Sequence, residues 1–250
     1  MTLFIAPGDE PLLASRGFTS FDTLWALPLT AVDEPNVGRG GWSQVFRLDL
    51  GDQGFYLKRQ ADYLTRSVRH PLGEPTVARE FRNIRRYHQL AVPALEASYF
   101  AERHHAGQWQ AMLLTRALDG WSELGAWLAQ WPVLTRERRA ALLQACGELA
   151  RKLHGAGLVH GCFYPKHIFL QPKGEGFEAR LIDLEKTRRA WFGQRDRVRD
   201  LEPLLRRATA WSEADIRGFL ATYLQTPATG PQVTAWMGQL LVRRRHKETR

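Results

Sequence analysis

The chain has 250 residues, 44% of them hydrophobic and 24% charged, which suits a globular protein of one large domain or two packed lobes. Its formal net charge of +9 favours phosphate-bearing partners, but does not choose among nucleic acid, nucleotides, lipid-borne phosphate and an anionic membrane face. Two cysteines, Cys146 and Cys162, exclude a disulfide framework and indicate a reducing, cytoplasmic location. No apolar run approaches the ~20 residues of a membrane-spanning helix, and residues 1–11 lack the pattern of a signal peptide.

The first part of the chain is rich in predicted strands. Residues 1–35 are expected to form an extension with one short helix around residues 20–27. A helix is predicted over residues 76–90, where apolar residues recur on one face and Pro93 follows. Strands are predicted from β-like composition and turn residues at positions 43–50, 54–59, 96–102 and 108–115.

Beyond about residue 117 the pattern becomes mainly helical. The predicted elements are helices over 122–131, over 135–155 with Thr135 as N-cap and after the Ser212/Asp215 capping box, and short strands over 168–171 and 179–182. The change predicts an α+β, bilobal fold with a hinge near residues 115–119. Its parts are the extension (1–35), a small β-rich lobe (36–116) and a larger helical lobe with a basic tail (117–250).

A glycine-rich turn precedes the first long strand, in Gly38-Arg39-Gly40-Gly41-Trp42-Ser43-Gln44-Val45. It matches G-x-G-x-x-G-x-V except at the third glycine, and glycines let backbone amides approach phosphates without a Cβ in the way. An ordinary hairpin turn is the alternative interpretation. The candidate nucleotide-binding residues in this stretch are Gly38, Gly40, Gly41, Ser43 and Val45.

Lys58 ends the second predicted strand, 13 residues after Val45. A kinase places a strand lysine there to pair with the α- and β-phosphates of its nucleotide. Glu80, on the following helix, is placed to orient that lysine by an ion pair. Each could instead be a solvated surface charge. Thr115, at the start of the predicted hinge, completes the candidate cofactor-binding residues.

The most specific motif is His160-Gly161-Cys162-Phe163-Tyr164-Pro165-Lys166-His167, followed by an apolar strand. Kinase catalytic loops read H-x-D-x-x-x-x-N before such a strand. Cys162 therefore stands at the position of the catalytic aspartate, and His167 at that of the metal-binding asparagine. Kinases of this type take ATP and Mg²⁺.

A second acidic position follows in Leu181-Ile182-Asp183-Leu184-Glu185. Asp183 at the end of an apolar strand matches the metal-binding aspartate of D-F-G, and a carboxylate suits Mg²⁺. Glu185 replaces the glycine of that motif. Asp200 either braces the catalytic loop or is a charge near a helix N-terminus.

In these motifs the chain resembles the Kdo/WaaP-like lipopolysaccharide kinase family, especially its InaA branch, from about Gly38 to Arg207. The resemblance extends to Tyr56-Leu57-Lys58-Arg59, Arg79-Glu80-Phe81-Arg82-Asn83-Ile84, Leu114-Thr115-Arg116-Ala117 and Ile182-Asp183-Leu184. Histidine in place of asparagine at position 167 is a trait of that family. The resemblance implies a protein-kinase-like fold. It also implies ATP-dependent phosphorylation of a heptose in the lipopolysaccharide core, on the cytoplasmic side of the inner membrane.

Cys162 departs from the family pattern, in which active members carry aspartate. A thiol is a poor substitute for a carboxylate as proton acceptor, and losing a general base slows transfer by roughly 10²–10⁴-fold. Two hypotheses follow, a sugar kinase and a pseudokinase that binds nucleotide and acts as a regulator or scaffold.

Two weaker hypotheses rest on charge alone. A nucleic-acid partner is not expected, because the sequence shows neither zinc-ligand spacing nor an aromatic-rich RNA motif. The basic tail over residues 243–250 is either a peripheral contact with anionic lipid or a solvated end.

Overall fold

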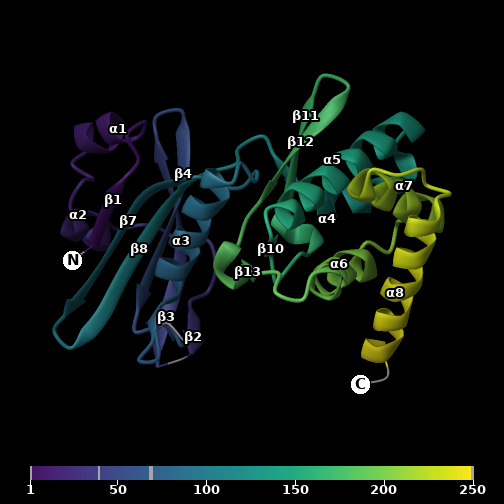
Figure 1. The fold of residues 1–250 in the computed structure, drawn as a ribbon. Coiled ribbons are helices and arrows are strands. Elements are labelled where there is room, and N and C mark those ends of the chain that lie inside the picture. Colours follow the sequence, from purple (N-terminus) through teal and green to yellow (C-terminus); the bar gives the residue numbers. More distant parts are fainter. Residues whose placement is uncertain (1, 39, 68–69, 249–250) are drawn as a thin grey trace. The chain divides into compact units, whose positions relative to one another are not determined.

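The structure is a computed structural model that describes residues 2–38, 40–67 and 70–248. Arg39 of the predicted glycine turn, and the side chains of the basic tail from Arg244 onward, lie outside the described part. The chain divides into two compact units (Figure 1). The first comprises Met1–Arg86 with Leu95–Asp119, and the second comprises Tyr87–Ala94 with Gly120–Arg250.

The first unit is built on an antiparallel sheet with the strand order β1-β7-β8-β4-β3-β2. The strands are β1 (Thr2–Ile5), β2 (Asn36–Gly38), β3 (Gly41–Leu50), β4 (Gln53–Ala61), β7 (Ala97–His105) and β8 (Gln108–Arg116). A two-stranded ladder of β5 (Leu64–Thr65) and β6 (Glu74–Pro75) precedes helix α3 (Thr76–Gln89). The four strands and the helix that the sequence predicts in this region are confirmed, and no end is displaced by more than three residues.

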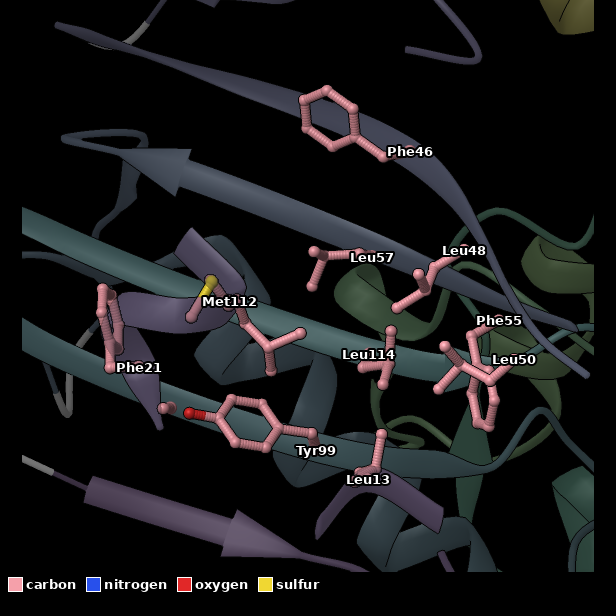
Figure 2. Close-up of a cluster of buried hydrophobic side chains, with 12 residues drawn as sticks. Leu13, Phe21, Phe46, Leu48, Leu50, Phe55, Leu57, Tyr99, Met112 and Leu114 are labelled. Carbon is pink, nitrogen blue, oxygen red and sulfur yellow. The ribbon is translucent and has the colours of Figure 1, made fainter. Parts of the chain in front are cut away.

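The pleat of the sheet gives it two different faces, because successive side chains of a strand point to opposite sides. One face carries a buried apolar cluster that contains Phe46, Leu57 and Leu114 from three neighbouring strands. Figure 2 shows these side chains together with Leu13 and Phe21 from the N-terminal segment. The opposite face packs against α3, where the Phe81 ring stacks on Phe100 with 4.3 Å between the ring centroids.

The N-terminal segment is more ordered than the single helix predicted for it. It contains β1, α1 (Glu10–Ser15) and α2 (Phe21–Ala26), and β1 pairs with β7 at the edge of the sheet. The predicted helix corresponds to α2, whereas β1 and α1 are too short to show a clear periodicity and are missed by the sequence alone.

Two arginines bind this segment to the sheet. Arg116 donates to both oxygens of the buried Asp9 carboxylate at 2.5–3.1 Å. Arg59 donates to the carbonyl oxygens of Leu24 and Leu27, each at 2.7 Å, at the C-terminal end of α2. Both arginines therefore connect the N-terminal segment to central strands.

The second unit is mainly helical. Its helices are α4 (Leu124–Ala129), α5 (Arg136–Gly155), α6 (Gln194–Arg207), α7 (Glu213–Leu224) and α8 (Pro231–Glu248), with short 3₁₀ turns at Trp131–Val133, Pro165–His167 and Leu184–Lys186. Its strands are β9 (Ser122–Glu123), β10 (Leu158–Val159), β11 (Ile168–Lys173), β12 (Gly176–Leu181) and β13 (Arg188–Arg189). None of the described helices has the length and apolar character needed to cross a bilayer.

Local signals in the second unit are mostly confirmed. Thr135 accepts a hydrogen bond from the backbone N of Arg138 at 3.2 Å, and the Ser212/Asp215 capping box is present. The prediction of a helix from residue 122 is wrong at its start. Ser122 and Glu123 pair with β11, and this ladder overrides the helical composition of the following residues.

Substitution of Gly41 would test how tightly the glycine turn is packed. A Cβ on Gly41 would lie 2.0 Å from the carbonyl oxygen of Ala61, whereas a Cβ on Gly38 would meet nothing within 4 Å. We expect Gly41→Ala to lower the free energy of unfolding by about 1–3 kcal/mol, as overpacking does, and Gly38→Ala to have little effect. Urea denaturation of both variants measures this, and equal midpoints would contradict the packing described.

Candidate functional site

The predicted pair of Lys58 and Glu80 is formed within the first unit. The Lys58 Nζ lies 2.6 Å from Glu80 Oε2. The Lys58 side chain is 28% exposed and that of Glu80 only 6%. A buried carboxylate depends on its cation, because its own desolvation is otherwise uncompensated. The pair thus fixes a lysine whose side chain is partly accessible to solvent.

A buried amide network places α3 beside the lysine strand. Gln60 donates to Ser43 Oγ at 3.0 Å and to Thr76 Oγ1 at 2.6 Å, and it accepts from the backbone N of Val77 at 3.1 Å. Thr76 lies one helical turn before Glu80, so the network fixes the start of the helix that carries the carboxylate. Ser43 is therefore part of this scaffold, and its hydroxyl is buried.

The strand register places several predicted residues on one face of the sheet. Lys58 is directly opposite Val45 on β3 and Leu113 on β8, and Thr115 is opposite Tyr56, the next residue of β4 on that face. Val45, Lys58 and Thr115 therefore project from the same face as α3.

The glycine turn connects β2 and β3. Gly38 pairs with Gly41, and Gly40 has φ of +87°, a conformation that favours glycine. A pocket of about 560 Å³ beside this turn is lined partly by Trp42 and Gln44. These residues alternate with Ser43 and Val45, so that part of the pocket faces away from Lys58.

In the second unit, His160 joins the predicted catalytic loop to the strand end before Asp183. Its Nδ1 accepts from the backbone N of Cys162 at 3.3 Å, so the proton lies on Nε2, which donates to the carbonyl oxygen of Ile182 at 2.9 Å. Burial lowers the pKa of His160 below its usual value, which keeps the ring neutral.

Asp200 braces this loop, which confirms one of the two interpretations of that residue. Its Oδ2 accepts from the backbone N of His160 at 2.7 Å, and its Oδ1 accepts from that of Gly161 at 2.8 Å. His154 Nε2 lies 3.2 Å from Oδ2, and His154 Nδ1 lies 2.8 Å from the hydroxyl of Tyr223. Asp200 is buried in the middle of α6, so it is no terminal helix charge.

His167 and Asp183 lie side by side, as the metal prediction requires. His167 Nδ1 donates to the carbonyl oxygen of Cys162 at 2.8 Å, which leaves Nε2 3.3 Å from Asp183 Oδ2. Burial is the main cause of a lowered pKa of His167, so its Nε2 presents a lone pair to the carboxylate. A carboxylate oxygen and an imidazole lone pair that face each other can both act as ligands of one cation.

Asp183 adopts the left-handed conformation, with φ of 57° and ψ of 60°. Outside glycine this conformation carries strain, and such residues gather at functional sites. Within residues 2–38, 40–67 and 70–248, no cluster contains three or more potential metal ligands. Mg²⁺ usually takes one or two protein ligands and completes its shell with water and substrate phosphates.

Cys162 is buried, and its backbone is fixed by its neighbours. Its carbonyl oxygen accepts from the backbone N of Tyr164 at 2.8 Å, in addition to His167. Lys186 lies close to the thiol. The pKa of Lys186 is raised, chiefly by its electrostatic interaction with Cys162. Sequence reasoning missed this lysine, and its position three residues after Asp183 was the one available signal.

Comparison with known proteins gives three findings. Residues 22–223 match the model of the lipopolysaccharide kinase (Kdo/WaaP) family. InaA of Escherichia coli (strain K12) is 33% identical over 180 residues, which is 71% of this chain and 83% of that protein. A solved structure of WaaP in complex with acyl carrier protein matches with a TM-score of 0.74 and 23% identity, covering 100% of this chain and 99% of that chain.

The structural match confirms the predicted fold class. The chain has the WaaP-like kinase fold of the α+β class, with an antiparallel sheet and helices in its N-terminal part and a helical C-terminal part.

The bracing role of Asp200 predicts a specific loss of stability. Asp200→Ala leaves the buried amide of His160 and the amide of Gly161 without their acceptor, so we expect a loss of about 2–5 kcal/mol in unfolding free energy. Asp200→Asn retains one acceptor oxygen and should lose less. Urea denaturation measures both, and amide hydrogen exchange should accelerate at residues 160 and 161. Unchanged exchange there would contradict the brace.

Proposed function

Because the chain belongs to the lipopolysaccharide kinase (Kdo/WaaP) family, we propose that it is an ATP-dependent kinase that phosphorylates a heptose of the lipopolysaccharide core. Membership of the family implies a phosphotransferase that uses ATP and a sugar of the lipopolysaccharide as acceptor. The observation that carries the proposal is the ion pair of Lys58 and Glu80, in which Nζ lies 2.6 Å from Oε2.

In the proposed enzyme, Lys58 binds the α- and β-phosphates of the nucleotide. Lysine acts on phosphate as a compact positive charge, and its buried partner Glu80 keeps it in one orientation. Val45 and Thr115 project from the same sheet face and would contact the rest of the nucleotide. Gly38, Gly40 and Gly41 stay predicted phosphate contacts through their backbone.

Asp183 and His167 are the residues that would hold Mg²⁺. Their fit rests on the 3.3 Å approach of a carboxylate oxygen to an imidazole nitrogen whose lone pair faces it. When bound, the metal would offset negative charge on the transferring phosphoryl group. Hydrogen bonds from the loop that contains His167 fix the backbone next to Asp183 and so position its carboxylate.

Cys162 stands where a kinase of this fold orients the attacking hydroxyl. Its thiol is a weak proton acceptor, but phosphoryl transfer depends mainly on positioning and charge stabilisation. Lys186, near that thiol, adds positive charge at the same place. Slow transfer is therefore consistent with the residues present. A heptose acceptor places the reaction at the cytoplasmic face of the inner membrane.

Loss of the lysine should weaken nucleotide binding. We expect Lys58→Ala to weaken Mg·ATP binding by about tenfold or more, because a hydrogen bond to a charged group is worth about 1.5–3 kcal/mol. Isothermal titration calorimetry measures this, with Lys173→Ala on the exposed hairpin end as the matched control. Equal affinities of wild type and a folded Lys58→Ala variant would overturn the nucleotide assignment.

Restoring the family residue should restore a base. We expect Cys162→Asp to accelerate phosphate transfer to isolated lipopolysaccharide core by roughly 10²–10⁴-fold, and Cys162→Ala to show what the thiol itself contributes. Release of ADP and incorporation of labelled phosphate are the measurements. Transfer by the wild type would exclude the pseudokinase.

The second candidate function is a pseudokinase that binds nucleotide and acts as a regulator or scaffold. Cys162 itself favours it. A wild type that binds Mg·ATP without transfer, together with a Cys162→Asp variant that transfers, would establish this alternative and refute the proposed enzyme.

A further inference from the structure

Two large aromatic side chains are exposed next to each other on the second unit. Trp191 is 71% exposed and Phe192 is 68% exposed, in the loop between β13 and α6. Apolar surface of this size in water is unfavourable, and an adjacent pair indicates a surface that another body covers.

The loop that presents these rings is held in place. The Asp196 carboxylate accepts from the backbone N of Phe192 at 3.1 Å and from the Arg188 guanidinium at 2.8 and 3.0 Å. The backbone N of Ala190 donates to the carbonyl oxygen of Gly157 at 2.9 Å. The aromatic pair is thus displayed by a fixed loop.

The surroundings of the two rings are strongly basic. Residues 188–199 contain five arginines and one aspartate, a net charge of +4. The aspartate is Asp196, which is buried and paired with Arg188. Arg189, Arg195 and Arg199 are exposed. Exposed positive charge therefore flanks exposed aromatic surface without an exposed acidic residue in this segment.

A groove lies between two of the helices that follow this loop in the second unit. A groove of about 780 Å³ between α6 and α8 is lined by residues that include Arg195, Val198 and Val242. Figure 1 shows α8, in yellow, beside α6 in the second unit. Val242 and its neighbour Leu241 are both exposed near the end of α8.

We propose that the Trp191–Phe192 loop, its flanking arginines and the groove between α6 and α8 form a docking surface for an anionic lipid bilayer. Aromatic rings prefer the headgroup level of a bilayer, and arginines beside them bind acidic lipid. A second copy of the chain is disfavoured as the occupant, because two such surfaces would repel each other. The inference deepens the proposed function, since it places the chain where a lipid-borne acceptor lies.

Insertion of the loop can be measured without any kinase reaction. Cys146 and Cys162 are both buried, so a cysteine placed at an exposed position is labelled selectively. Phe192→Cys would carry an environment-sensitive fluorophore, and Val133→Cys, at a position 83% exposed, is the matched control. The probes are vesicles of equal parts phosphatidylglycerol and phosphatidylcholine, and vesicles of phosphatidylcholine alone, each with a nitroxide-labelled lipid as quencher.

We expect the label at position 192, but not that at 133, to shift to the blue and be quenched by the anionic vesicles. Unlabelled Trp191→Ser/Phe192→Ser and Arg189→Gln/Arg195→Gln should each bind these vesicles about tenfold more weakly, with Val133→Ser unchanged.

Absence of quenching at position 192, or equal binding to both kinds of vesicle, would overturn the proposal. Disulfide crosslinking of Phe192→Cys between two copies would assign the surface to a dimer, and saturable binding of an acidic protein there would assign it to that protein. These vesicles contain neither sugar acceptor nor ATP. A negative result with them would therefore overturn the docking surface and would not bear on the proposed kinase reaction.

Discussion

A single buried carboxylate organises the second unit. Asp200 accepts the amides of His160 and Gly161, and through His154 it connects α6 to α5 and, by way of Tyr223, to α7. A buried carboxylate without partners is costly, so this one is tolerated only while each of its acceptor sites is used. The same hydrogen bonds that stabilise the helical packing therefore fix the backbone of the loop. One group therefore contributes both to the helical packing and to the shape of the loop.

The packing of the first unit holds Lys58 in a fixed and partly accessible position. Its sheet must bury one apolar face completely, and the N-terminal segment provides the cover. Arg59 and Arg116 bind that segment from the central strands, in the same two motifs that carry Lys58 and Thr115. Alternation along the strand then directs Arg59 to the covered face and Lys58 to the opposite one, toward Glu80. Packing thus explains the two arginines of these motifs, while the role proposed for Lys58 uses the opposite face of the sheet.

The sequence predicts those features of the fold that have a local physical cause in a pattern of residues. These features are the long strands, the capped helices and the order of the kinase motifs. It fails where a long-range contact decides the outcome. Ser122 becomes a strand residue because β11 lies beside it. Lys186 lies against the loop at Gly161, where an added Cβ would come within 2.6 Å of the Lys186 carbonyl oxygen. The role of Asp200 was open for the same reason, since no local pattern shows which amides a carboxylate will accept.

Cys162 takes part in the hydrogen bonds of its loop through its backbone. The contacts that shape the loop at Cys162 go to its backbone: the amide donates to His160, and the carbonyl accepts from His167 and Tyr164. These backbone hydrogen bonds do not depend on the identity of the side chain at position 162. A chain can lose a base in this way and keep the fold, the family motifs and the groups proposed to hold nucleotide and metal. The activity proposed for this chain therefore depends on the side chain of Cys162 and on Lys186 beside it, and not on the backbone contacts of the loop.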